Sequence, residues 1–293
     1  MVAIGIDLGG TRIKGVAVDA GGNLLHQLYL PTNDGDGAVW KQGVADTVDQ
    51  LLQKINSDVV GISAPGLPND DNRSIGCMPG RMQGLENFIW KDYLQRPAYV
   101  LNDAVAALMA EARLGAAKNK KHVVMLTLGT GVGGAILIDG KPYQGAFSKA
   151  GHIGHMVIDH NGDPDVTGMP GSLEECIGNC TIEKRTNGKF TSTHAMLTAM
   201  RNGDRIAKEV WLRSVRHLAM GLASVTNIIS PEMIVLGGGI TEAGNDLFDP
   251  LTEYMAQYEW RAGGNKVQIV KATYGDMAGA TGAACFAMEK QQL

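Results

Sequence analysis

The sequence predicts an α/β protein in which one structural plan is used twice. Three observations lead to this prediction: short apolar runs typical of strands, glycine-rich loops directly after several of these runs, and a second half that repeats the order of the first. The chain has 293 residues, enough for about two domains with their own cores. We expect an N-terminal domain over 1–117, a C-terminal domain over 118–275, and a final helix over about 276–293 that packs on the N-terminal domain.

The composition argues against several classes of protein. The chain has 26 basic and 30 acidic residues, and the resulting net charge of −4 makes a nucleic-acid partner unexpected. No apolar run approaches the roughly 20 residues that span a bilayer, so we expect a cytoplasmic protein without a membrane partner. The four cysteines are expected as reduced thiols. Glycine is abundant, with 39 residues, so many positions require a positive φ or a close backbone approach.

The first half is predicted to begin with a three-stranded meander and to continue with helices that alternate with strands. The expected elements are strands over 2–6, 13–18 and 24–30, a helix over 40–55, strands over 59–62 and 99–101, and a helix over 104–114. The helix before the fourth strand implies a crossover to a parallel strand. Asn102 and Asp103 follow the last strand and are well placed to cap the helix after it.

After a basic stretch at 118–121 the pattern starts again. At an offset of 120, Leu8 aligns with Leu128 and Asp19 with Asp139, which indicates a short internal repeat. The Asp139-Gly140 pair predicts a tight hairpin turn. The expected elements of this half are strands over 123–128 and 135–138, a loop over 162–171, an amphipathic helix over 206–229, a buried strand over 233–236, and a small-residue helix that begins at 278.

The glycine loops at the ends of strands are candidate phosphate-binding sites. Exposed backbone N–H groups bind phosphate oxygens, and glycine lets a phosphate approach without a Cβ in the way. The loop over 129–134 matches G-x-G-x-x-G, but a strand follows it instead of a helix, which argues against a dinucleotide site. Tight hairpin turns would explain either loop alone. Two loops in a repeated context favour a site where each half binds one end of a polyphosphate chain.

Five motifs, in order, resemble those of the ROK family, named after repressors, open reading frames and kinases. They are Asp7-Leu8-Gly9-Gly10-Thr11, Leu101-Asn102-Asp103-Ala104, Thr127-Leu128-Gly129-Thr130-Gly131-Val132-Gly133-Gly134, Gly151-His152-Ile153-Gly154-His155 and Leu236-Gly237-Gly238-Gly239. The resemblance spans essentially the whole chain. It implies an ATP-dependent sugar kinase with the duplicated ribonuclease-H-like fold of actin-like ATPases, in which two domains enclose a central cleft.

The resemblance also implies roles for individual residues. Asp103 would accept the proton of the sugar hydroxyl, and the alternative is that it only caps a helix. Asp7 would hold hydrated Mg²⁺, whereas Lys14, on a strand, would point to solvent and is left out. Nucleotide-binding residues are expected at Asp7, Gly9, Gly10, Thr11, Gly129, Thr130, Gly131, Gly238 and Gly239. Sugar-binding residues are expected at Gly66, Asn102, His152, His155 and Glu174.

Two positions depart from the family pattern. His152 stands where glutamate is usual in the family. Because histidine can donate a hydrogen bond, accept one or carry charge, the family's sugar preference does not transfer to this chain. One expected consequence is a sugar KM that depends on pH. Family members commonly hold a structural zinc with the histidine that matches His155 and with cysteines of the next loop. Residues 161–172 contain no cysteine, so we expect no zinc. An alternative zinc set would need Cys176 and Cys180 on one helical face, together with His152, His155 and His160.

These observations favour a hexose kinase that uses ATP and Mg²⁺ to phosphorylate a primary hydroxyl, with the 6-OH of glucose as the leading acceptor. N-acetylmannosamine, N-acetylglucosamine, fructose, mannose and allose stay open, as does polyphosphate as donor. A rival is a sugar-responsive, non-catalytic regulator, which would carry a DNA-binding domain before the strand that starts at Val2. Another rival, an actin-like ATPase, would not need the Asn102-Asp103 and Gly154-His155 elements. The resemblance implies a homodimer.

Overall fold

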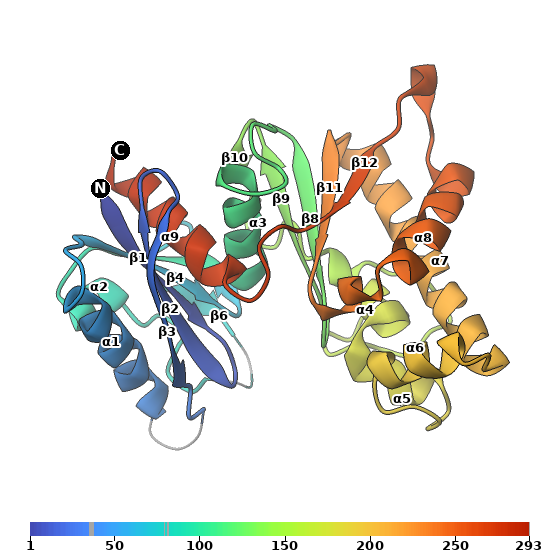
Figure 1. Ribbon diagram of the computed structural model, residues 1–293, viewed down its shortest axis with the longest axis horizontal. Coiled ribbons are helices and arrows are strands. Elements are labelled where there is room, and N and C mark those ends of the chain that lie inside the picture. The colour runs from blue at the N-terminus through green and yellow to red at the C-terminus, as the bar shows by residue number, and fades with distance from the viewer. Residues whose placement is uncertain (35–37, 79, 81, 293) are drawn as a thin grey trace. The chain divides into compact units, whose positions relative to one another are not determined.

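A computed structural model of the protein describes residues 1–34, 38–78, 80 and 82–292. The chain divides into two compact units, each with its own sheet (Figure 1). Unit 1 contains Met1–Lys120, Gly140–Ala150 and Ala272–Leu293, and unit 2 contains Lys121–Asp139 and Gly151–Lys271. The segment 140–150 therefore belongs to unit 1, although the sequence placed it within the C-terminal domain.

Unit 1 is a sheet with the strand order β3-β2-β1-β4-β7 and with helices on both faces. The β1–β2 and β2–β3 pairs are antiparallel, and the β1–β4 and β4–β7 pairs are parallel. The strands are β1 (Val2–Leu8), β2 (Arg12–Asp19), β3 (Leu24–Pro31), β4 (Val59–Ala64) and β7 (Ala98–Asn102). The helices and short strands of this unit are α1 (Val39–Leu52), α2 (Trp90–Leu94), α3 (Asp103–Arg113), α9 (Ala278–Gln291), β5 (Leu67–Pro68), β6 (Ile75–Cys77) and β10 (Lys141–Pro142).

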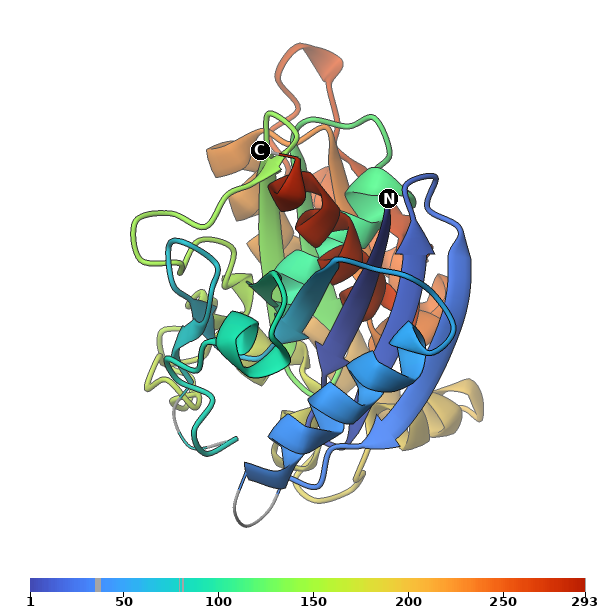
Figure 2. The same ribbon diagram turned by 90° about the vertical axis from the view of Figure 1, so that its left-hand side faces the viewer.

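Side chains alternate along β1, so its two faces pack against different helices. Ile4, Ile6 and Leu8 join the core under α1, whereas Ala3 joins the core under α9. In Figure 2, α1 crosses in front of the strands and α9, in red, lies behind them. Since residues of odd number share a face in this strand, Asp7 lies on the side of α9.

Unit 2 repeats the plan of unit 1 with the strand order β9-β8-β11-β12. The β8–β9 pair is antiparallel, and β11 is parallel to both of its neighbours, as β4 is in unit 1. Residues 2–10 and 122–130 also share one pattern of buried and exposed positions, so the predicted repeat is confirmed. The strands are β8 (Val123–Leu128), β9 (Val132–Ile138), β11 (Met233–Gly237) and β12 (Gln268–Lys271).

Helices cover one face of this second sheet. Val124 and Leu126 of β8 and Ile234 of β11 pack in one core with α7 and α8. The apolar stripe expected of the amphipathic helix over 206–229 is buried from Val210 to Val225 of α7, whereas Ile206, in the first turn, is exposed. The helices of unit 2 are α4 (Leu173–Ile177), α5 (Ile182–Arg185), α6 (Thr193–Arg201), α7 (Arg205–Ile229) and α8 (Asn245–Tyr258), with 3₁₀ turns η2 (Ile153–His155), η3 (Asn179–Thr181), η4 (Gly239–Ala243) and η5 (Ala262–Gly264).

Candidate active site

The junction of β7 and α3 places two polar residues side by side at the carboxyl end of a parallel strand. The side-chain oxygen of Asn102 accepts the backbone N–H of Ala104 at 3.0 Å and that of Val105 at 3.4 Å, so Asn102 caps α3 as predicted. Its amide nitrogen donates to the carbonyl of Gly66 at 3.1 Å. Since Asn102 fills the capping position, the helix does not depend on Asp103 for its cap.

Asp103 is the first residue of α3, and the residue as a whole is exposed to solvent. Protein groups nevertheless surround the carboxyl group, and this burial together with the negative charge of Asp7 raises its pKa to about 6. The backbone N–H of Ala104, 2.8 Å from Oδ1, opposes the rise because it stabilises the ionised form. A carboxylate with a pKa near neutrality can accept a proton and release it again at physiological pH.

Asp7, at the end of β1, is held by two polar neighbours. Its Oδ1 accepts a hydrogen bond from the hydroxyl of Ser63 at 2.7 Å, and its Oδ2 lies 3.2 Å from the ammonium group of Lys14. Lys14 also contacts the carboxylate of Asp276 at 2.8 Å. The expectation that Lys14 points to solvent was therefore wrong, because the β1–β2 register sets residues 7 and 14 directly opposite each other.

The loop between β1 and β2 carries the other predicted nucleotide-binding residues of unit 1. The Gly9 N–H donates to the carbonyl of Arg12 at 3.2 Å, and the Gly9 carbonyl accepts the hydroxyl of Thr32 at 2.6 Å. Gly10 and Thr11 are exposed at the tip of the loop. In this arrangement Gly9 stabilises the turn while Gly10 and Thr11 present their surface to solvent.

The matching loop of unit 2 is fixed by the chain segment that follows α4. The Gly129 carbonyl accepts the N–H of Asn179 at 3.0 Å, and the Thr130 carbonyl accepts that of Cys180 at 2.8 Å. The Glu174 carboxylate accepts the Val132 N–H at 2.8 Å. A Cβ at Gly131 would lie 2.2 Å from the same carboxylate, so glycine is required there for Glu174 to approach the loop.

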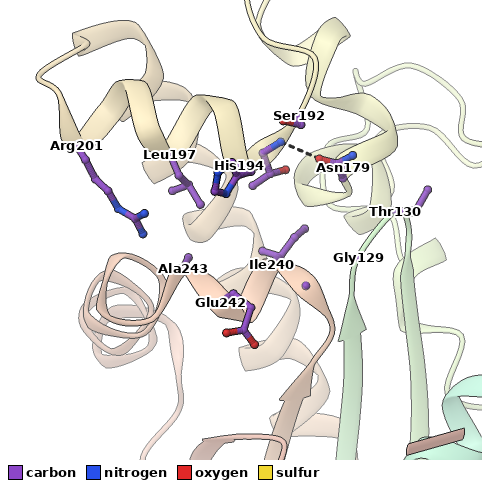
Figure 3. Close-up of a pocket in the computed structure, with 12 residues that line it drawn as sticks. Gly129, Thr130, Asn179, Ser192, His194, Leu197, Arg201, Ile240, Glu242 and Ala243 are labelled. Atoms are coloured by element: carbon purple, nitrogen blue, oxygen red, sulfur yellow. Dashed lines mark hydrogen bonds between the residues drawn. The ribbon is translucent and has the colours of Figure 1, made fainter. Parts of the chain in front are cut away.

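Beside this loop lies a cavity of about 430 Å³, formed wholly within unit 2 (Figure 3). It brings together three of the predicted nucleotide-binding residues, Gly129 and Thr130 from one loop and Gly239 from another. A Cβ at Gly239 would contact nothing within 4 Å, whereas one at Gly238 would lie 2.4 Å from the Leu128 carbonyl. Gly238 is therefore explained by packing and by its φ of 87°, and Gly239 by the wall of the cavity.

The rest of the cavity wall was not predicted from the sequence. Leu197 and Ile240 supply apolar surface, and the charged side chains of Arg201 and Glu242 lie at its edge (Figure 3). Apolar walls with a few polar groups are typical of sites for small organic molecules. The lining residues are Gly129, Thr130, Asn179, Ser192, Thr193, His194, Leu197, Arg201, Gly239, Ile240, Glu242 and Ala243.

The two predicted sugar-binding histidines lie around the 3₁₀ turn η2. Their rings are stacked, with centroids 6.3 Å apart and planes 14° apart. His155 Nδ1 lies 2.8 Å from Oδ2 of Asp165, whose side chain is fully buried. Sequence reasoning missed Asp165, since nothing in the pattern of the 162–171 loop shows that one of its carboxylates folds back onto the histidine.

The alternative zinc set is not assembled. It needed Cys176 and Cys180 on one helix, but α4 ends at Ile177 and a separate 3₁₀ turn holds Cys180. Cys176 is buried while Cys180 is exposed. Over the ranges that the structure describes, no cluster of three or more histidine, cysteine, aspartate or glutamate side chains is arranged to bind a metal ion. Within the same ranges no helix has the length and apolar character needed to cross a membrane.

Comparisons with known proteins agree with this architecture. A family model described as "ROK family" matches residues 3–290. The glucokinase of Halalkalibacterium halodurans is 32% identical, and the alignment covers 95% of this chain and 92% of the relative. A ROK hexokinase structure from Thermus thermophilus has a TM-score of 0.89 at 28% identity and covers 100% of this chain and 99% of its own. A ROK family glucokinase from Streptomyces griseus, solved with glucose and AMPPNP, has a TM-score of 0.82 at 26% identity, with coverage of 99% and 100%.

Proposed function

The chain belongs to the ROK family and is a sugar kinase, and from this premise we propose that it transfers the γ-phosphoryl group of ATP to the primary hydroxyl of a hexose, with glucose as the leading acceptor. Asp103 accepts the hydroxyl proton as the sugar oxygen attacks phosphorus. The bond between phosphorus and the bridging oxygen of ADP breaks in the same displacement, and ADP leaves.

The main support for the proposal is the raised pKa of the Asp103 carboxyl group. This group is not needed to cap α3, because Asn102 does so, and burial and Asp7 raise its pKa to about 6. A carboxyl group with a raised pKa beside a second carboxylate, and not needed to cap its helix, is the pattern expected of a general base.

The cavity of unit 2 supports ATP as the donor. Its volume of about 430 Å³ and its apolar wall suit a nucleoside, and the exposed Thr130 stands at its edge, where phosphate oxygens would follow. The Streptomyces griseus relative was solved with an ATP analogue, which favours the same donor here. Polyphosphate would leave this cavity without a ligand, so ATP and polyphosphate are compared directly in the assay below.

Mg²⁺ is implied by phosphoryl transfer from ATP, and the residues at Asp7 fit it. Mg²⁺ prefers oxygen ligands and usually keeps several waters, so one carboxylate is a sufficient protein ligand. The Asp7 carboxylate, with Ser63 beside it, offers such oxygens. When bound there, Mg²⁺ would neutralise phosphate charge, while Lys14 keeps the Asp7 side chain in place.

The acceptor is proposed to bind through Gly66, Asn102, His152, His155 and Glu174. The Asn102 amide is already bonded to the Gly66 carbonyl, which fixes both groups for contacts with hydroxyls. His152 replaces the glutamate usual in the family, so mannose, allose, fructose and the two N-acetylhexosamines stay in the panel of candidate acceptors. A homodimer, expected from the family, is checked by light scattering on the purified protein.

The experiment that tests the proposal is a coupled assay of ADP release over a panel of hexoses, with ATP or polyphosphate as donor. We expect ADP release that depends on a hexose and saturates with it, and a product phosphorylated on the primary hydroxyl by NMR. The Asp103→Asn variant is the matched control, since it keeps the shape of the site. Steady ATP hydrolysis that no sugar changes would point to an ATPase and overturn the proposal.

A further inference from the structure

Residues 159–171 form a loop that is organised around the buried side chain of Asp165. Oδ1 of this residue accepts the Thr167 N–H at 2.8 Å, the Thr167 hydroxyl at 2.7 Å and the Met169 N–H at 3.1 Å. Oδ2 is directed at His155 Nδ1, 2.8 Å away, and none of the side chain is exposed. Both oxygens of one carboxylate are thus engaged, and Oδ2 reaches out of the loop to a proposed sugar ligand.

The pairing decides which nitrogen of His155 carries the proton. Burial alone would raise the pKa of Asp165, but the hydrogen bonds from Thr167 and His155 outweigh it and hold the pKa well below its usual range. The carboxylate is therefore ionised and can only accept hydrogen bonds. Nδ1 of a neutral His155 must then be the protonated nitrogen, and Nε2 must carry the lone pair.

Nε2 is the nitrogen left for a ligand. The His155 side chain is 29% exposed, and among the described residues Nε2 has no hydrogen-bond partner. The ring of His152 lies nearly parallel to it, with the two ring centroids 6.3 Å apart. An imidazole whose Nδ1 is held by a buried carboxylate presents its remaining nitrogen in a defined direction.

We infer that Asp165 is a positioning residue of the acceptor site, which fixes the Nδ1–H tautomer of His155 so that Nε2 accepts a hydrogen bond from a sugar hydroxyl. This inference rests on the proposed function, because it assigns His155 to the sugar. It goes further in giving the direction of the hydrogen bond and in naming a residue that does not itself touch the sugar. A hydroxyl in contact with this nitrogen must point its hydrogen at Nε2, so Asp165 sets the polarity of the contact.

Asp165→Asn gives the sharpest test, since carboxamide and carboxylate have nearly the same shape. Three donors surround the Oδ1 position, so the amide oxygen is expected to stay there and the NH₂ group to face His155. That group can only donate, which moves the proton of His155 to Nε2 and turns the acceptor into a donor. The same exchange beside a catalytic histidine in serine proteases keeps the geometry and imposes the wrong tautomer.

The matched control is Thr167→Val, which removes one hydrogen bond to Oδ1 but leaves the carboxylate facing His155. Both variants should lower the melting temperature. Only Asp165→Asn should raise the sugar KM, by about 10- to 100-fold as expected for a hydrogen bond of the wrong polarity, with the KM for ATP within about twofold of wild type. Thr167→Val should keep both KM values within about twofold.

The tautomer is read directly by two-bond ¹H–¹⁵N NMR of ¹⁵N-histidine protein at pH 8, with the signal assigned by His155→Gln. We expect the proton on Nδ1 in the wild type and on Nε2 in Asp165→Asn. A wild-type proton on Nε2, an unchanged sugar KM in Asp165→Asn, or an equal rise in Thr167→Val would each overturn the inference. If no hexose is phosphorylated, the proposed function fails, but the wild-type spectrum still tests the pairing of Asp165 with His155 Nδ1. The same spectrum tests this pairing if Asp165→Asn does not fold.

Discussion

Asp103 offers the most demanding test of the mechanism, because its two protonation states have opposite consequences for activity. Only the carboxylate can accept the hydroxyl proton, and burial together with Asp7 raises its pKa to about 6. The value of kcat/KM for the sugar should therefore rise with pH through about 6 and level off above it, since this parameter reports the free enzyme. At pH 5 roughly one molecule in eleven would carry the ionised group, so the rate should be about tenfold below the plateau.

Replacing the Asp103 carboxylate with an amide tests proton transfer separately from sugar binding. Asp103→Asn should lower kcat by about 10²- to 10⁴-fold, which is the usual contribution of a positioned base, and should leave the sugar dissociation constant within a few fold of wild type. The residual activity should no longer change across pH 6. Calorimetric titration with the sugar and a coupled kinase assay from pH 5 to 8.5 measure the two effects separately.

Stability provides an independent check on the same carboxyl group. A group whose pKa is raised on folding stabilises the folded state below its ordinary pKa, and this contribution is lost as the pH rises through about 6. Asp103→Asn should therefore raise the melting temperature at pH 8 more than at pH 4. A near-normal kcat in this variant, or an acid limb of the wild-type profile well away from pH 6, would refute the reasoning.

Three further predictions concern packing, charge and thiol reactivity. Gly61→Ala should lower the free energy of unfolding in urea by roughly 1–3 kcal/mol or more, because its Cβ would lie 1.9 Å from a carbonyl of α9. The control Gly275→Ala, with open space around the new Cβ, should be nearly neutral. Lys14→Met should raise the pKa of Asp103 further, because the negative charge of Asp7 is then no longer neutralised. The acid limb of the kcat/KM profile should therefore move to higher pH, and Lys14→Arg should restore the wild-type profile. At pH 8 iodoacetamide should modify the exposed Cys77 and spare Cys176, since burial raises the pKa of the Cys176 thiol to about 11, and peptide mass spectrometry distinguishes the two.

The parts of the fold that depend on local pattern could be predicted from the sequence. The strands β1, β2 and β3 of the first meander were predicted from apolar runs separated by glycine-containing loops, and the Asp139-Gly140 turn has the positive φ values, 50° and 74°, that its residue types favour. Asn102 was recognised as a cap because capping is a contact between neighbours in the chain. Each of these features is decided within about ten residues.

The residues that were missed are those whose partners are decided by register or by a folded loop. Lys14 pairs with Asp7 because the hairpin sets them opposite each other, and that register depends on how the loop at 9–11 closes. Asp165 reaches His155 only after the loop has turned back on itself. The cavity wall from α6 needed the tertiary fold as well, since no glycine motif marks His194 or Arg201.

The excess of glycine has more than one physical cause, and the structure separates them. Gly5 and Gly61, in adjacent strands, would each place a Cβ 1.9 Å from a carbonyl of α9, so they are required by the close approach of a helix to a sheet and not by phosphate. Gly279, near the start of that helix, would place one 2.7 Å from Oδ1 of Asp7. The small-residue helix thus closes over the carboxylate that in turn raises the pKa of Asp103. Packing of α9 is therefore part of what sets the proton affinity of the proposed base, although no residue of α9 itself titrates at the site.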